Sequence, residues 1–382
     1  MDSSPLNTLP QETLHQIFCQ LPIRQIAAAK CVCKALYSSL SSASFRHLLR
    51  TQSQPLALLA LKPSHRHASP QPTLHSFDPS SNRWLKFSLA FLPFAALHPI
   101  TSSHGLLYLW ASVQNSRNSP AQNSQKALIV CNPLTGQFKT LPQLGSAWSR
   151  HGSVLAGSPG VVVVLTELAV LYYSETANPD GRNFDFNGLS NWLKFSSNLP
   201  SKPRSPVLIS DFILTLCDVG SPWRSQWAMF KTKIVGMEKT MQWIRVEKRE
   251  WGEIFDILKR PRLVRAGNSR KVYMVGGLKS SYALQSACTT ILILRLDLEN
   301  LEWEEAGRMP VEMYKCFMES SKFKVFGGGN RVCFSAKRLG RLALWEESID
   351  GKAEWRWVES VPGTGDGLCR GFVFEAGLDS VP

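Results

Sequence analysis

The spacing of apolar residues divides the chain into two parts. Near the start, apolar residues follow the i, i+3, i+4, i+7 spacing of one face of a helix: Leu14, Ile17, Phe18 and Leu21. From residue 56 onward, short runs rich in Val, Leu, Ile, Phe and Tyr alternate with Gly, Pro, Ser and Asn. That alternation is typical of strands and turns. The pattern predicts a short helical unit followed by a long all-β part.

The first fifty residues are predicted to hold three short helices. Pro10 suits the first turn of the first helix, because its missing N–H would have no partner there. Leu21-Pro22 ends that helix, since the residue before a proline is pushed out of the α region. A second helix is expected over residues 23–30, and a third carries the stripe Cys33, Leu36, Tyr37 and Leu40. Such a unit is near the minimum size for independent folding, so some of its apolar residues should face a partner.

The motifs of this segment resemble those of the F-box family in order and spacing: Leu9-Pro10-x-Glu12, Ile17-Phe18, Leu21-Pro22, Val32-Cys33-Lys34 and Phe45-Arg46. Leu36 departs from the family pattern, which often has tryptophan there. The resemblance implies a small all-α F-box over residues 1–50 that binds the Skp-type adaptor of a cullin-RING ubiquitin ligase. The adaptor-binding residues that it implies are Leu9, Pro10, Ile17, Leu21, Pro22, Val32 and Leu36. The alternative is an unrelated helical bundle that caps a second domain.

A recurring strand, polar turn and aromatic residue indicate repeats in the all-β part, as in the segments 77–84, 131–138 and 296–303. The aromatic residues are separated by 54, 54, 51, 60 and 54 residues: Trp84, Phe138, Trp192, Trp243, Trp303 and Trp357. This period is near the roughly 50 residues of a kelch unit, and Gly276-Gly277 and Gly327-Gly328-Gly329 resemble the kelch glycine signature. We therefore expect residues 51–382 to form an all-β six-bladed kelch-like propeller, with the aromatic residues packed between blades.

The ring is expected to close through the end of the chain. The first unit, from Leu56, has three evident strands, and an extra strand over residues 371–376 remains after the sixth unit. Pairing the two would remove two exposed sheet edges. The most apolar stretch, residues 160–173, is interrupted by Thr166-Glu167 and is shorter than the roughly 20 residues that cross a bilayer. A hairpin is the better interpretation.

The sequence offers little catalytic or metal-binding chemistry. All eight histidines lie at or before His151, and no GxSxG, HExxH or Walker motif is present. Cys31-x-Cys33 is spaced too closely for a usual zinc site, and Gly327-Gly328-Gly329 leads into a strand, which favours a tight hairpin over a phosphate loop. We expect no enzyme activity, metal or cofactor. The nine cysteines are interpreted as small core residues in a reducing compartment, and a location in the nucleus and/or cytoplasm is expected.

Positive charge is concentrated in one region. The chain carries a net charge of +14, and residues 231–271 hold 12 Lys/Arg against 5 Asp/Glu, a net of +7. We expect propeller loops there to contact an acidic segment of a target protein through Lys231, Lys233, Lys239, Arg260, Arg262 and Arg265. A solvated surface and nucleic-acid binding are the alternatives.

Together with the family resemblance, these features predict the substrate-recognition subunit of a Skp-cullin-F-box ubiquitin ligase, with no membrane partner. A ligase-independent F-box scaffold and a nucleic-acid-associated propeller remain the other interpretations.

Overall fold

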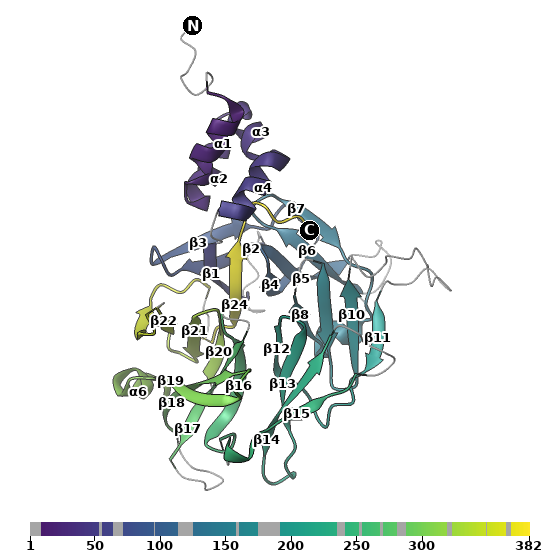
Figure 1. Ribbon diagram of the computed structural model, residues 1–382, viewed down its shortest axis with the longest axis vertical. Helices are drawn as coiled ribbons and strands as arrows, with labels where there is room; N and C mark the ends of the chain where they lie inside the picture. The colour runs from purple at the N-terminus through teal and green to yellow at the C-terminus, as the bar shows by residue number, and fades with distance from the viewer. Residues whose placement is uncertain are drawn as a thin grey trace, which may run out of the picture.

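The computed structural model describes residues 9–52, 56–63, 72–94, 96–113, 125–157, 160–174, 192–234, 241–251, 254–267, 270–280, 288–318, 323–348, 350–363 and 368–382. The N-terminal helices stand at one end of the long axis of the molecule, and a six-bladed propeller forms the rest (Figure 1). The predicted fold class is confirmed.

The helical unit contains one helix more than predicted. Its members are α1 (Gln11–Cys19), α2 (Ile23–Lys30), α3 (Lys34–Leu40) and α4 (Ala43–Gln52). The apolar stripe of α4 spans little more than one turn, Phe45, Leu48 and Leu49, which is too short to stand out in the sequence. Pro10 lies just outside α1 in an extended conformation, with ψ 145°, and not within its first turn as predicted. The carbonyl of Pro10 accepts the N–H of Leu14 at 3.1 Å.

Each blade is a four-stranded antiparallel sheet with one strand innermost, next to the propeller axis. From the innermost strand outward, blade 1 consists of β24 (Gly371–Ala376), β1 (Leu56–Leu61), β2 (Thr73–Asp78) and β3 (Arg83–Ser88). Blade 2 consists of β4 (Leu97–Ser103), β5 (Leu106–Val113), β6 (Gln125–Asn132) and β7 (Gln137–Thr140). Blade 3 consists of β8 (Ser153–Ala156), β9 (Val161–Leu165), β10 (Ala169–Ser174) and β11 (Leu193–Ser196).

In the same direction, blade 4 consists of β12 (Arg204–Ile209), β13 (Phe212–Asp218), β14 (Trp227–Lys233) and β15 (Ile244–Val246). Blade 5 consists of β16 (Leu258–Arg265), β17 (Lys271–Lys279), β18 (Cys288–Asp297) and β19 (Glu302–Arg308). Blade 6 consists of β20 (Phe323–Gly328), β21 (Arg331–Ala336), β22 (Leu342–Glu347) and β23 (Ala353–Val358). Two short helices, α5 (Ser146–His151) and α6 (Val311–Met318), lie in connections between blades. The innermost strands β24, β4, β8, β12, β16 and β20 contact one another in turn and surround the propeller axis.

The C-terminal strand closes the ring. β24 pairs with β1 along its whole length, from Leu56 opposite Ala376 to Leu61 opposite Gly371. It is the innermost strand of blade 1, and its Phe374 is fully buried against residues of blades 1 and 2. The two ends of the propeller are therefore joined by hydrogen bonds, which leaves neither β1 nor β24 as an open edge on that side.

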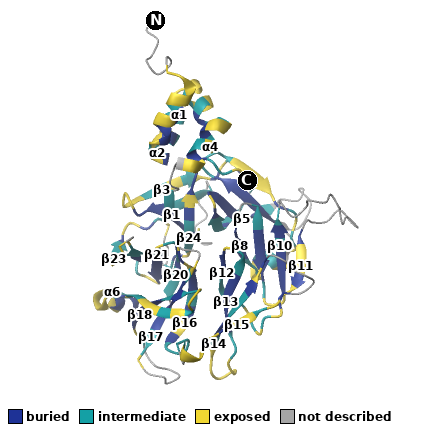
Figure 2. Cartoon of the chain, in the orientation of Figure 1, coloured by how far each residue is buried: buried dark blue, intermediate teal, exposed yellow. Residues whose placement is uncertain are grey.

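Buried apolar clusters fill each junction between neighbouring blades, and the strands that form them are dark blue in Figure 2. Most repeated aromatic residues pack in these clusters, as predicted: Trp84, Trp192, Trp243, Trp303 and Trp357. Phe138 is the exception, because its ring is exposed and contacts Phe94 edge-on with centroids 6.2 Å apart. Trp357 lies near the end of β23 and does not open it, so the repeat is less regular in the last blade.

Both predicted hairpins are confirmed. β9 and β10 pair across the turn that holds Thr166-Glu167, and β20 and β21 pair across Gly329-Asn330. The two glycine runs nevertheless occupy different places in their blades. Gly276-Gly277 lies in the second strand of blade 5, whereas Gly327-Gly328 ends the innermost strand of blade 6. The glycine signature thus does not recur at one structural position.

The core interpretation of the cysteines holds for five of the nine, which are buried: Cys19, Cys131, Cys217, Cys333 and Cys369. Burial raises the pKa of the Cys131 thiol to about 12, as expected for a packing residue. The interpretation is wrong for Cys31 and Cys33, which are exposed on the helical unit. The Cys33 sulfur accepts the backbone N–H of Leu36 at 3.5 Å and so caps the start of α3.

Gly307 of blade 5 packs closely against a tryptophan of blade 6. A β-carbon placed there would lie 2.5 Å from Nε1 of Trp345, a fully buried side chain of β22. We expect Gly307→Ala to lower the free energy of unfolding by about 1–3 kcal/mol through overpacking. Chemical denaturation measures the free energy of unfolding of the variant and of the unmodified chain. Gly145→Ala is the matched control, since its β-carbon would meet nothing nearer than Trp148 Cδ1 at 3.8 Å; equal midpoints for the two variants would contradict the expectation.

Candidate partner-binding sites

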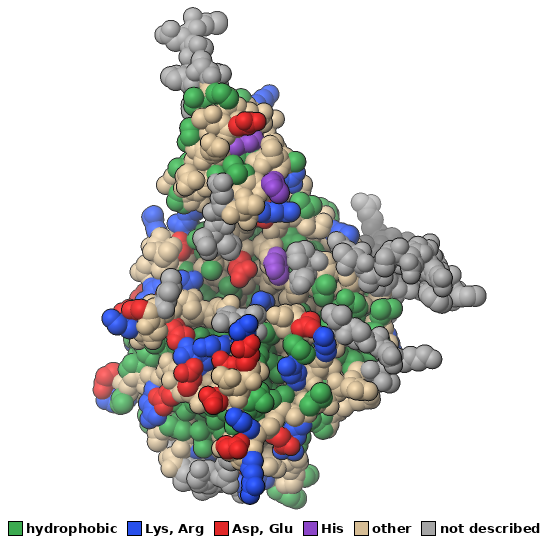
Figure 3. All heavy atoms as spheres, viewed as in Figure 1, with side chains coloured by type: hydrophobic (Ala, Val, Ile, Leu, Met, Phe, Trp, Pro, Cys, Tyr) green, Lys and Arg blue, Asp and Glu red, His purple; other side chains and the backbone are tan. Residues whose placement is uncertain are grey.

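The helical unit exposes apolar side chains, and hydrophobic side chains show among polar ones on its surface (Figure 3). Ile17 is 48% exposed and Val32 is 73% exposed, although both are large apolar residues. Leu9, Pro10 and Pro22 are exposed as well. Five of the seven predicted adaptor-binding residues are thus available to a partner, which is the arrangement expected of a docking surface.

The other two predicted residues, Leu21 and Leu36, are half-buried against the core of the helical unit. Their first role is to hold the helices together. Sequence reasoning missed Tyr37, which is 59% exposed next to this surface, with the Lys30 ammonium 5.4 Å from its ring. The sequence pattern could have indicated Tyr37, because this residue belongs to the apolar stripe of the third predicted helix.

The helical unit shares its core with the end of the chain. Leu378 is 4% exposed and packs with Phe18, Ile26 and other core residues of the four helices. At the rim, the Arg24 guanidinium pairs with the buried carboxylate of Asp78, the last residue of β2. Residues 377–382, which we call the C-terminal tail, thus lie between the helices and the propeller (Figure 1).

Hydrogen bonds hold the C-terminal tail on the propeller. The buried Asn132 side-chain amide donates to the carbonyl oxygens of Gly377 at 2.9 Å and Ser380 at 2.8 Å. The Ser380 hydroxyl donates to the carbonyl of His104 at 2.6 Å. On the other side, the Arg50 guanidinium donates to the carbonyl of Asp379 at 2.9 Å. The tail therefore fixes the direction in which the helical unit projects, a feature that the sequence pattern did not indicate.

The structure separates the basic residues that were predicted to act together. Arg260 lies near the beginning of β16 and Arg262 near its middle, whereas Arg265 ends that strand, roughly 16 Å beyond Arg260 at about 3.3 Å per residue. Lys233 ends β14 and lies 3.5 Å from the Asp211 carboxylate. Lys231 lies on the same strand, 3.8 Å from the centre of the Phe212 ring. Lys239 falls outside the described residues.

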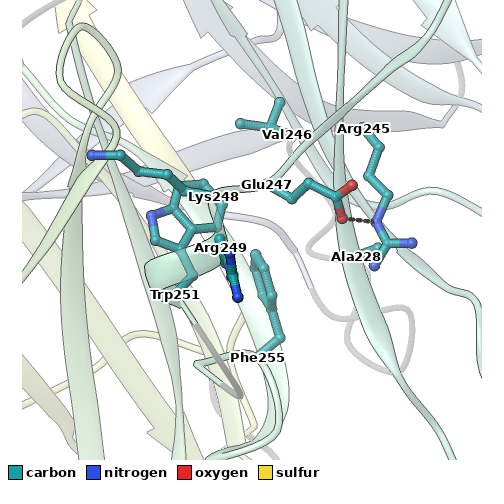
Figure 4. Close-up of a pocket in the computed structure, with 8 residues that line it drawn as sticks. All are labelled: Ala228, Arg245, Val246, Glu247, Lys248, Arg249, Trp251 and Phe255. Carbon is teal, nitrogen blue, oxygen red and sulfur yellow. Dashed lines mark ion pairs between the residues drawn. The ribbon is translucent and has the colours of Figure 1, made fainter.

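Other charges of the basic region line a shallow pocket of about 130 Å³ (Figure 4). It is lined by Ala228, Arg245, Val246, Glu247, Lys248, Arg249, Trp251 and Phe255. Arg245 pairs with Glu247 at 2.8 Å, and the Trp251 indole N–H donates to the carbonyl of Leu301 at 2.8 Å. Arg245, Glu247 and Trp251 of this pocket thus already have partners within the chain.

Within the part of the chain that the structure describes, no three His, Cys, Asp or Glu side chains gather where they could hold a metal ion. The helices that the structure describes are all too short or too polar to span a membrane.

Comparison with known proteins places this geometry in a family. The F-box-like family pattern matches residues 6–51, the segment that forms the four helices. Over its full length the chain is 55% identical to "SKP1-interacting partner 15" of Arabidopsis thaliana, across 394 aligned residues that cover 100% of both proteins. This chain belongs to the F-box protein family. The F-box chain is also 24% identical to "Protein UNUSUAL FLORAL ORGANS" of Arabidopsis thaliana, over 96% of its own length and 81% of that protein.

Proposed function

We propose that this F-box protein is the substrate-recognition subunit of a Skp-cullin-F-box ubiquitin ligase. In this role the F-box binds the Skp-type adaptor and the propeller binds the target, while the chain itself makes and breaks no covalent bond. The observation that carries the proposal is the 55% identity, over the whole of both chains, with a relative named SKP1-interacting partner 15. The exposed apolar surface of the F-box supports it, because such a surface on so small a unit favours a protein partner.

Proximity is what this subunit would contribute to ubiquitin transfer. Holding a target beside the reacting groups converts a bimolecular step into an effectively unimolecular one. The benefit depends on a defined geometry. Asn132 binds the C-terminal tail to the propeller, while Arg50 and the F-box core bind Asp379 and Leu378 of the same tail, which limits how the F-box turns on the propeller. In the proposed complex the target is presented in a fixed direction relative to the adaptor.

We also assign the propeller to the kelch type. The spacing of the repeated aromatic residues, 51 to 60 residues, is close to the kelch period of roughly 50. Kelch-type blades vary in their loops while the packed strands stay constant, which suits a domain that recognises one target among many.

Replacing Leu9 and Pro10 together by alanine should weaken capture of a purified Skp-type adaptor by at least about tenfold, since truncating a buried anchor of an interface typically costs 1 kcal/mol or more per residue. Binding of the purified chain to immobilised adaptor measures the effect. The helical circular dichroism signal should be unchanged, because both residues are exposed and precede α1.

Leu168→Ala is the matched control, since Leu168 is 82% exposed in the turn between β9 and β10. It should capture the adaptor like the unmodified chain. Equal capture by the Leu9/Pro10 variant would show that the adaptor does not dock on this surface.

A further inference from the structure

A pocket of about 450 Å³ lies where the F-box, the C-terminal tail and the propeller meet. Its wall is formed by α2 and α4 on one side, by the turn between β4 and β5 on the other, and by β24 and the tail that follows it (Figure 1). Sites for small molecules typically measure roughly 300–1,000 Å³. This pocket is large enough for one, whereas the pocket of about 130 Å³ in the basic region is not.

Part of the wall of this junction pocket is apolar and comes from both domains. It is formed by Ile23 of α2, Leu49 of α4, Leu106 of β5 and Leu378 of the C-terminal tail. These four side chains are only 4% to 8% exposed, so they form a fixed surface and not a set of mobile side chains. An apolar group that enters the pocket would be removed from water against the F-box and the propeller at once.

The charged groups of the wall are mainly hydrogen-bond acceptors. Glu375 is exposed at the pocket, and its carboxylate has no partner among the side chains that the structure describes. The Asp379 carboxylate accepts Nε–H of Arg50 at 3.3 Å, and the same guanidinium donates to the Asp379 carbonyl at 2.9 Å. The wall thus holds two carboxylates against one guanidinium, and that guanidinium is already directed to the tail.

The hydrogen bonds of Ser103 indicate that His104, which also lines the pocket, adds a third acceptor. The Ser103 hydroxyl donates its one hydrogen to the carbonyl of Gly157 at 2.7 Å, and its oxygen lies 2.8 Å from Nδ1 of His104. Because that hydrogen is used, we assign a hydrogen to Nδ1, which donates to the Ser103 oxygen. In the neutral imidazole Nε2 is then left as an acceptor.

We propose that the junction pocket binds a small organic ammonium ion, in which an apolar chain or ring carries a single charged amine. An ammonium group has hydrogen-bond donors and no acceptor, so it complements the carboxylates of Glu375 and Asp379 and Nε2 of His104. An organic acid would meet two like charges there. One ammonium also balances the wall, whereas the net charge of +14 on the whole chain would repel an ion with several positive charges.

Binding at this place would strengthen the joint between the two domains. The wall exists only while the F-box, the C-terminal tail and the propeller are packed together. A ligand that binds this arrangement and not the separated parts stabilises the arrangement by mass action. The site is separate from the predicted adaptor-binding surface and from the propeller loops predicted to bind the target, so it adds a ligand that the proposed ligase role does not require.

The test uses the full chain and three dansyl probes that share a five-carbon chain and end in an ammonium, an acetamide or a carboxylate. Fluorescence anisotropy should show that the ammonium probe binds at least about tenfold more tightly than the acetamide probe, as expected for charge-assisted hydrogen bonds. Glu375→Gln should remove most of that preference, and Glu375→Lys should reverse it in favour of the carboxylate probe. Both variants should fold, because the side chain is exposed, and circular dichroism checks this.

Glu354→Gln is the matched control, since Glu354 is also an exposed glutamate on a strand but belongs to the outermost strand of blade 6. It should keep the preference for the ammonium probe. A chain without residues 377–382 lacks one wall of the pocket and should lose binding of this probe. Equal affinity for the ammonium and acetamide probes, an equal loss in the Glu354 variant, or unchanged binding without the C-terminal tail would each overturn the proposal.

Discussion

A chain that lacks residues 369–382 should fail to fold into a soluble propeller. The deletion removes β24, and with it the innermost strand of blade 1 and the neighbour of both β4 and β20. Phe372, Phe374 and Ala376 are buried in the propeller. Losing one buried phenylalanine side chain typically costs about 3–5 kcal/mol, and a folded domain has only about 5–15 kcal/mol in total. We expect aggregation or a large drop in melting temperature, measured by size exclusion and thermal unfolding.

A shorter deletion isolates the role of the strand. Removing only residues 377–382 keeps β24 paired with β1 and takes away the C-terminal tail. The propeller of this variant should melt close to the temperature of the full chain. If the longer deletion also melted like the full chain, the ring would not depend on β24 for its closure.

The variant Leu378→Ala should lose F-box structure and adaptor capture while the propeller stays intact. The F-box is near the lower size limit for independent folding, and Leu378 completes its core from outside. Truncating a buried leucine costs about 2–5 kcal/mol, which is a large share of what so small a helical unit can have. Circular dichroism should show reduced helix content, and binding to immobilised adaptor should fall by tenfold or more at about 1.4 kcal/mol per factor of ten.

Val381→Ala is the control for this effect, because Val381 lies in the same C-terminal tail and is 51% exposed. It should behave like the unmodified chain in both measurements. Full helix content and full adaptor capture in the Leu378 variant would mean that the F-box is stable without the tail. That result would remove the physical reason for a fixed direction between the F-box and the propeller.

The sequence by itself determined the helical unit, the number of blades and the packing of most repeated aromatic residues. These features depend on local patterns: the helical spacing from Leu14 to Leu21, the turn after each strand and the recurrence of an aromatic residue after 51 to 60 positions. Local pattern failed for α4, whose apolar stripe is short, and for Phe138, which has the right position in its unit but lies in the open. A sequence pattern indicates that a residue can be buried. Whether it is buried depends on the side chains of the neighbouring blade that pack against it.

Only the tertiary structure decided which charges lie near one another and which residues pack the C-terminal tail against the F-box. Residues 231–271 form one basic run in the sequence, yet Arg260 lies near the beginning of β16 and Arg265 at its end, and Arg262 between them is influenced by Arg204 and Arg370 of other blades. Leu378 enters the core of helices that are more than 300 residues away along the chain. The reason is topological. A closed ring brings the beginnings of all inner strands to one mouth, and it places the first and last strands of the propeller in one blade. Its contacts therefore depend on position in a blade and not on distance along the sequence.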